Sequence, residues 1–146
     1  MELQPKRITD AASFEGFRNL LQSSGLPHQD LDFQRHILMG YHDNDELVGT
    51  GALEIYGENA LLRSLAVKIG ARGLSLGSSI IKDLIRQGKK NNLKGIYLLT
   101  ETAASFFALK GFKEISRDLV PDDVRRSSEF SHVCPASATC MFLECV

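Results

Sequence analysis

The stretch from residue 72 to residue 78, Arg-Gly-Leu-Ser-Leu-Gly-Ser, has the residue types of a turn that binds an anion. An apolar run ends just before it at Val67, and a helical pattern follows it. The apolar residues of that pattern share one face: Leu76, Ile80, Ile81, Leu84 and Ile85. The first N–H groups of a helix have no partner within the helix, and together with the helix dipole they favour phosphate. The stretch therefore predicts a phosphate-bearing ligand, although an ordinary strand–helix turn without a ligand would give the same pattern.

A second residue with possible chemistry is Arg63, which interrupts the apolar strand Leu61-Leu62-Arg63-Ser64-Leu65-Ala66-Val67. Side chains alternate between the two faces of a strand, so Arg63 shares a face with Leu61, Leu65 and Val67. A buried guanidinium needs an anionic partner. Two partners fit: an internal acid such as Glu54, or a carboxylate of the substrate held in bidentate fashion.

The composition excludes several classes of protein. The chain has 146 residues, of which 43% are hydrophobic and 24% charged, so we expect one globular domain over residues 1–146. Its net charge of −1 gives no electrostatic basis for binding nucleic acid. No apolar run reaches the roughly 18 residues of a membrane-spanning helix. The three cysteines, Cys134, Cys140 and Cys145, without a secretory signal, indicate free thiols in the cytoplasm, and their spacing predicts no metal site.

The elements that must position these residues follow a recognisable order. A weak strand is expected near residues 3–8, and Asp10 is placed to cap the helix that follows. Three strands then form an antiparallel meander: 36–41, 47–56 and 60–67. The second half of the chain is expected to alternate between helix and strand: helix 74–90, strand 95–100, helix 102–110, strand 112–115, helix 121–126 and strand 139–144.

The turn and the strand before it resemble the acetyl-CoA-binding motif of the GNAT acetyltransferases, Arg/Gln-x-x-Gly-x-Gly/Ala after a strand that often reads Leu-Ala-Val. Arg72 and Gly77 match the motif, and residues 65–67 match the strand. Ser75 stands where the first motif glycine belongs, and this position needs a backbone conformation that serine tolerates. Residues 106–112 resemble the second family motif, Phe-Tyr-x-x-x-Gly-Phe, and the order of elements agrees over nearly the whole chain.

The resemblance implies an α/β (α+β) fold of the GNAT type. Its mixed central sheet of about six to seven strands would carry helices on both faces and would splay between the strands at 60–67 and 95–100. The co-substrate would be acetyl-CoA, held by residues of the first strand, the turn and the second motif: Leu65, Ala66, Val67, Arg72, Gly73, Leu74, Ser75, Leu76, Gly77, Ser78 and Phe106.

Two departures from the family concern the catalytic groups. The direct attack of an amine on the thioester needs a base and a donor for the thioester oxygen, and the departing thiolate needs stabilisation. The family often supplies tyrosine for the thiolate, but this chain has Phe107, which leaves water, the hydroxyl of Thr100 or Thr102, or no group at all. The base position is Leu61 here. We therefore place Glu101, Thr100 and Thr102 at the catalytic centre, with Glu54 and Glu58 as the other available carboxylates.

A finer resemblance links residues 61–67, 97–100, 106–107, 129–130 and 134–138 to the small GNAT proteins of arsenic-resistance operons and to the acetyltransferase domain of N-acetylglutamate synthases. It implies N-acetylation of a small amino acid or amino-acid-like compound, through a ternary complex and with a homodimer as a possible assembly. The acceptor-binding residues would be Arg63, Arg125, Ser128 and Cys134. The plainer interpretations are an internal salt bridge for Arg63 and a buried apolar thiol for Cys134. For Arg125 and Ser128 the plainer interpretation is a solvated surface. A peptide acetyltransferase and a non-catalytic acyl-CoA-binding module are the alternative functions.

Overall fold

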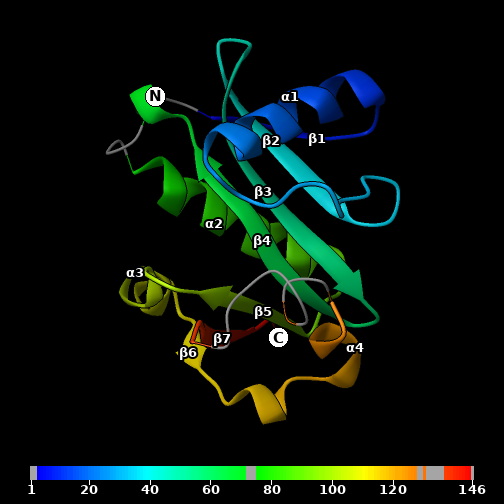
Figure 1. The fold of residues 1–146 in the computed structure, drawn as a ribbon, viewed down its shortest axis with the longest axis vertical. Coiled ribbons are helices and arrows are strands. Elements are labelled where there is room, and N and C mark those ends of the chain that lie inside the picture. Colours follow the sequence, from blue (N-terminus) through cyan, green and yellow to red (C-terminus); the bar gives the residue numbers. More distant parts are fainter. Residues whose placement is uncertain (1–2, 72–74, 128–129, 131–136, 146) are drawn as a thin grey trace.

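The computed structural model describes residues 3–71, 75–127, 130 and 137–145, and it is organised around a seven-stranded mixed sheet (Figure 1). The strand order is β1-β2-β3-β4-β5-β7-β6. The strands are β1 (Gln4–Arg7), β2 (Ile37–Asp43), β3 (Glu46–Tyr56), β4 (Asn59–Val67), β5 (Gly95–Thr100), β6 (Lys113–Glu114) and β7 (Thr139–Glu144). The α-helices are α1 (Ala11–Ser23), α2 (Leu76–Lys90), α3 (Ala104–Leu109) and α4 (Asp122–Arg125), and the 3₁₀ turns are η1 (Ile69–Ala71) and η2 (Arg117–Leu119). The expected fold class is confirmed.

The first half of the sheet is an antiparallel meander, as the turn residues predict. Asn44 and Asp45 both have positive φ, 48° and 70°, which suits the tight connection between β2 and β3. Asp10 caps α1 by accepting a hydrogen bond from the backbone N–H of Ser13 at 2.8 Å. β1 joins the meander by pairing with β2.

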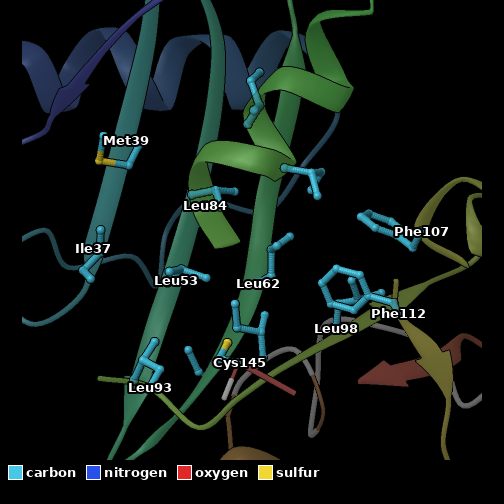
Figure 2. Packing of buried hydrophobic residues seen from close by; sticks show 14 of the residues in the cluster. Ile37, Met39, Leu53, Leu62, Leu84, Leu93, Leu98, Phe107, Phe112 and Cys145 are labelled. Atoms are coloured by element: carbon cyan, nitrogen blue, oxygen red, sulfur yellow. The ribbon is translucent and has the colours of Figure 1, made fainter. Parts of the chain in front are cut away.

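Helices cover both faces of the sheet. α2 packs on one face, where its apolar stripe joins side chains of β2 to β5 in the main core, shown in Figure 2. A Cβ on Gly49 or Gly51 of β3 would lie 2.5 Å from Ile80 or 2.6 Å from Leu84, so these glycines let α2 approach the sheet closely. On the other face, α1 packs through Phe17 and Leu21, and α4 packs through Val124.

The parallel pair β4 and β5 is the point where the sheet opens. Their register contains three pairs, Asn59–Gly95, Ala60–Ile96 and Leu61–Tyr97, and the two strands diverge after that (Figure 1). β7 pairs antiparallel with all six residues of β5 and holds β6 at the edge of the sheet. The predicted splay is therefore confirmed.

Several element boundaries differ from the sequence prediction, including those of α2, α3 and β6. The described part of α2 begins at Leu76 instead of residue 74, because Ser75 is in the left-handed conformation. α3 begins at Ala104 instead of residue 102, since the Thr100 hydroxyl accepts a hydrogen bond from the Ala103 N–H and keeps the chain in a turn. β6 has two residues instead of four and pairs with β7 alone. In the part of the chain that the structure describes, no helix has the length and apolar character needed to cross a membrane.

Candidate functional site

The divergence of β4 and β5 creates a cavity of about 580 Å³, which we call the gap cavity. One wall is formed by Leu62 to Leu65 of β4, and the opposite wall by Leu98 to Thr100 of β5. Phe106 and Phe107 of α3 and the segment Gly25–Pro27 after α1 close it further. Because the two strands do not pair here, main-chain groups of both strand ends can bind a ligand placed between them.

A β-bulge in β4 shapes the wall of the gap cavity. Thr50 of β3 pairs with Ala66 while Ala52 pairs with Arg63, so Ser64 and Leu65 together stand opposite Gly51. Ser64 has φ 61°, and its carbonyl oxygen accepts a hydrogen bond from the Thr50 hydroxyl at 2.8 Å. The bulge is therefore held by a buried side chain of the neighbouring strand.

The N-terminus of α2 supplies the second part of the cofactor region. The first-turn residues Leu76, Gly77 and Ser78 carry the N–H groups that an α-helix leaves without helical partners. A Cβ on Gly77 would have the Phe106 ring as its nearest neighbour, at an ordinary 3.6 Å. The protein itself thus leaves room at Gly77, which fits a ligand that lies against this backbone.

A cavity of about 260 Å³ lies on the same helix end, lined by Ser75, Ser78, Ser79, Ile81, Lys82, Ile85 and Lys110. Its two lysines suit a phosphate-bearing ligand, and the Lys110 ammonium lies 5.6 Å from the centre of the Phe106 ring. Arg72, Gly73 and Leu74 of the predicted cradle lie outside the described residues. The described residues of this region therefore fit coenzyme A, with pantetheine in the gap cavity and phosphates at the start of α2.

The predicted catalytic residues lie at the end of β5. Thr100, Glu101 and Thr102 all line the gap cavity, and Glu101 and Thr102 are exposed. The Thr100 hydroxyl is engaged as an acceptor by the Ala103 N–H at 3.0 Å. Phe107 is 6% exposed and packs edge-on against Phe106 and Phe112, so it offers the gap cavity a ring without a donor.

Arg63 is buried and paired within the protein. Its Nη1 lies 2.5 Å from Oδ2 of Asp30 and 3.3 Å from Oε1 of Glu54, and its Nη2 lies 3.0 Å from Oδ1 of Asp30. Nη2 also donates to the Pro27 carbonyl at 3.3 Å. Of the two partners that the sequence left open, the internal acid is therefore present, and it is joined by Asp30. The clamp on a substrate carboxylate stays a prediction, because such a carboxylate would have to replace Asp30.

Asp30 and Glu54 also line a second cavity, of about 370 Å³, which we call the charged cavity. Its described lining residues are Asp30, Asp32, Arg35, His36, Glu54, Tyr56, Asp123, Arg126 and Ser127. Acids and bases thus face the same space. Arg35 and Arg126 are exposed, and neither forms an ion pair within the described ranges. Two guanidinium groups are therefore available to an anionic ligand.

Burial tunes the titratable groups of the charged cavity. Desolvation raises the pKa of Glu54 even though the Arg63 guanidinium opposes that change. His36 accepts a hydrogen bond at Nδ1 from the Ile55 N–H at 2.9 Å, and burial lowers its pKa. Burial and the nearby Glu54 raise the pKa of Tyr56 to about 12. Glu54 therefore holds a proton more readily than an exposed glutamate, which is a property of a general base that works near neutral pH.

The remaining predicted acceptor residues have different positions. Arg125 pairs with Asp122 and lines none of the cavities described above, whereas the adjacent Arg126 lines the charged cavity. Ser128 and Cys134 lie outside the described residues. Cys140 and Cys145 are free thiols, as predicted, and burial raises the pKa of both. Over the described ranges, no group of three or more His, Cys, Asp or Glu side chains is placed to hold a metal ion.

Sequence reasoning missed several residues of the charged cavity, namely Asp30, His36 and Tyr56. Asp30 and His36 lie in or next to the segment 28–34, which has no clear secondary-structure pattern. The contact between Asp30 and Arg63 spans 33 residues, and no local pattern encodes it. A usable signal existed for Glu54, because pairing of the strands 47–56 and 60–67 places it directly across from Leu61.

Comparison with known proteins identifies a family for this architecture. The model of the acetyltransferase (GNAT) family matches residues 7–112. A GNAT-family acetyltransferase from Staphylococcus aureus Mu50 has 18% identity and a TM-score of 0.76, over 99% of this chain and all of that one. Rv2747 from Mycobacterium tuberculosis, crystallised with CoA and NLQ, has 21% identity and a TM-score of 0.76, over 97% of this chain and 98% of that one.

The N-acetylglutamate synthase from Neisseria gonorrhoeae, crystallised with coenzyme A and N-acetyl-glutamate, has 16% identity and a TM-score of 0.80. All of this chain is covered, but only 36% of the synthase, so the chain corresponds to about a third of that protein. At these low identities the structural likeness shows the fold alone. No curated protein sequence matches the chain significantly.

Proposed function

The chain belongs to the GNAT acetyltransferase family, which uses acetyl-CoA, and we propose that its acceptor is the amino group of a small amino acid or amino-acid-like compound. The observation that carries this proposal is the charged cavity beside the gap cavity. It presents acids and bases to the same small space, as a zwitterion requires. Arg63 lines the gap cavity and pairs with two acids of the charged cavity, so its side chain links the residues of the two cavities.

The acceptor would be held by charges of opposite sign. Arg35 and Arg126 are the cations that can bind a carboxylate without first losing an internal partner. Arg63 can take part if the acceptor carboxylate replaces Asp30, whose side chain is 27% exposed and can then turn to solvent. Asp30, Asp32 and Asp123 supply negative charge for the ammonium group.

The acetyl thioester of acetyl-CoA supplies the electrophile, and the chain must supply the base for the amine. Glu54 stands across from Leu61, the position where the family often has its base, and directly opposed residues of paired strands share a face of the sheet. This position supports Glu54 as the general base, acting from β3 instead of β4. Glu101 lines the gap cavity and remains the second candidate, with Thr100 and Thr102 beside it.

The proposal is tested by following thiol release from acetyl-CoA by the purified full chain. The acceptors are the twenty amino acids, their arsenic- and phosphorus-containing analogues, the decarboxylated amines and short peptides. We expect turnover with acceptors that carry a carboxylate or a similar anion, and at least about tenfold lower kcat/KM for the matched amines. Equal activity on peptides would favour a peptide acetyltransferase. Binding of acetyl-CoA without turnover of any acceptor would favour a non-catalytic module.

Two matched variants separate the candidate bases. Replacing the base by an isosteric amide removes its proton affinity, so the correct one of Glu54→Gln and Glu101→Gln should lower kcat by about 10²-fold or more and abolish the acidic limb of the pH–rate profile. The other variant should retain that limb.

A further inference from the structure

Asp30 holds the guanidinium of Arg63 in the way that an arginine holds the carboxylate of a ligand. Both of its carboxylate oxygens take part: Oδ2 lies 2.5 Å from Nη1, and Oδ1 lies 3.0 Å from Nη2. Two parallel N–H···O bonds of this kind are the bidentate geometry by which arginine recognises carboxylates and phosphates. The Asp30 side chain is therefore an internal anion bound to Arg63.

The two acids on Arg63 differ in how firmly the fold holds them. Glu54 belongs to β3, its side chain is 5% exposed, and its Oε1 lies 3.3 Å from Nη1. Asp30 belongs to the segment between α1 and β2, which contains turns but neither helix nor strand, and its side chain is 27% exposed. Asp30 can therefore leave Arg63 by a local movement, whereas Glu54 is fixed by the sheet.

The burial of Arg63 explains why an internal anion is needed in the free protein. The Arg63 side chain is 1% exposed, and a guanidinium so deeply buried is costly when it lacks an anionic partner. Asp30 lines the charged cavity and supplies such a partner. A ligand carboxylate that took the place of Asp30 would leave the charge around Arg63 unchanged, because one carboxylate replaces another and Glu54 stays where it is.

We propose that Asp30 occupies the anion subsite of the acceptor in the free protein and competes with the acceptor for Arg63. The proposal rests on the acceptor proposed above, a small amine that carries a carboxylate. In the exchange, the Asp30 side chain turns to solvent and the acceptor carboxylate accepts both N–H···O bonds from Arg63. No covalent bond changes. Asp30 is thus a residue that determines acceptor specificity through competition.

Competition of this kind sets the affinity for the acceptor and selects its anionic group. An internal carboxylate is present at a high effective concentration, so a ligand group displaces it only if it also fits the two-pronged guanidinium. The apparent Kd of the acceptor is the intrinsic Kd divided by the fraction of protein in which Asp30 has left Arg63. Asp30 therefore weakens the binding of every acceptor that uses Arg63, and its removal should strengthen that binding.

The main test is Asp30→Asn, which keeps the shape of the side chain and removes its charge. For an amino acid that the wild type acetylates, the Kd measured by calorimetry with coenzyme A present should fall about tenfold or more. The matched decarboxylated amine should bind both proteins equally. If Asp30 instead binds the ammonium group of the acceptor, the same variant should raise the Kd, and that result would overturn the proposal.

Asp32→Asn is the matched control, because it makes the same chemical change two residues later in the same segment. Asp32 lines the charged cavity, where its Oδ1 accepts a hydrogen bond from the Gln34 N–H at 2.9 Å. The variant removes negative charge that faces the ammonium group, so it should raise the Kd of the acceptor. A lower Kd in both variants would indicate a general effect of charge in the cavity and would contradict competition at Arg63.

A second test needs neither an acceptor nor turnover. Asp30→Gly removes the equivalent of an acetate ion from Arg63, so added acetate should bind in its place and raise the unfolding temperature of the variant as its concentration increases. Sodium chloride at the same ionic strength should not have this effect, and acetate should not have it on the wild type. Absence of rescue by acetate would overturn the proposal. Rescue in a chain that acetylates no amino acid would refute the proposed function and leave the anion subsite in place.

Discussion

The gap cavity and the charged cavity lie side by side, but they are lined by different kinds of chemical group. The gap cavity offers mainly apolar side chains and open strand ends, and the start of α2, which lines a separate cavity, offers backbone N–H groups. The charged cavity is lined by acids, arginines, a histidine and a tyrosine. A site made from the backbone depends on main-chain geometry, whereas a site made from charges depends on the identity and pairing of each side chain.

Arg63 connects the residues of the two cavities. It lines the gap cavity, while its guanidinium binds two carboxylates that belong to the charged cavity. The difference between the regions predicts different responses to mutation. Changes in the gap cavity should affect acetyl-CoA binding when they obstruct the backbone, and changes in the charged cavity should affect both stability and acceptor selectivity.

The largest expected effect is at Gly77, in the first turn of α2, where backbone N–H groups are expected to bind the cofactor. Gly77→Asp would place a carboxylate against the expected position of the pyrophosphate, and we expect acetyl-CoA affinity to fall more than about 100-fold by calorimetry. The fold should persist, because among the described residues a Cβ here meets the Phe106 ring at an ordinary 3.6 Å. Gly77→Ala separates steric from charge effects and should weaken binding much less. Unchanged affinity of Gly77→Asp would refute the placement of the phosphates.

Among the changes around the charged cavity, Arg63→Leu should produce the largest effect. It leaves Glu54 buried without its guanidinium, so we expect a loss of about 3–5 kcal/mol in the free energy of unfolding by chemical denaturation. Arg63→Leu/Glu54→Leu should recover most of this loss, because a buried ion pair can be replaced by apolar side chains at little cost.

The same variant tests the acceptor clamp. If an acceptor carboxylate replaces Asp30 on Arg63, the folded Arg63→Leu protein should lose about 100-fold in kcat/KM for amino acids and retain its activity on amines without a carboxylate. Its affinity for acetyl-CoA should stay nearly constant. A uniform loss for both classes of acceptor would leave Arg63 with a structural role alone.

The contrast between the regions also explains what could be predicted from the sequence. Strand β4 and the apolar stripe of α2 follow from short local patterns, which is why residues 61–67 and 76–85 were placed correctly, whereas the open gap was expected from the resemblance to the family. The pairing of Arg63 with Asp30 joins residues 33 positions apart, and Asp30 lies in a segment without periodicity. The sequence therefore identified the need for an anionic partner but could not choose between Glu54, Asp30 and a substrate. The charged cavity is lined by Arg126 and not by the predicted Arg125. Which of the two adjacent residues faces the cavity depends on the helix phase of α4, and a four-residue helix leaves that phase undetermined from the sequence.

A smaller effect should appear in the pH dependence of stability. Glu54 has a raised pKa in the folded protein, so the native state holds its proton more tightly than the unfolded state does. The contribution of Glu54 to stability is therefore fully present when the pH is below the ordinary pKa of glutamate, and it is lost as the pH rises through the pKa of Glu54 in the folded protein. Each unit of separation corresponds to about 1.4 kcal/mol.

The measurement is the difference in unfolding free energy between wild type and Glu54→Gln across the acidic to neutral range. Relative to the variant, the wild type should lose stability as the pH rises. His36, with its lowered pKa, contributes in the opposite sense in both proteins, gaining stability as the pH rises, and largely cancels in the difference. Glu101→Gln is the matched control, because it makes the same chemical change at an exposed position. A difference that grows with pH would mean that Arg63 outweighs burial at Glu54.

The smallest expected effect is at Ser75, where the chain departs from the family motif within the backbone-built region. Ser75 has φ 60° and ψ 23°, which glycine adopts without strain, and its side chain makes no capping hydrogen bond. Ser75→Gly should therefore raise the free energy of unfolding by about 0.5–1 kcal/mol, since the relieved strain exceeds the added entropy of the unfolded chain. Ser78→Gly makes the same chemical change three residues later, at a helical φ, and should lower stability by a similar amount. Both are measured by thermal unfolding without acetyl-CoA. Destabilisation by both substitutions would mean that the Ser75 side chain contributes an interaction worth more than its strain, and the backbone of the cofactor region would then depend on side chains as the charged cavity does.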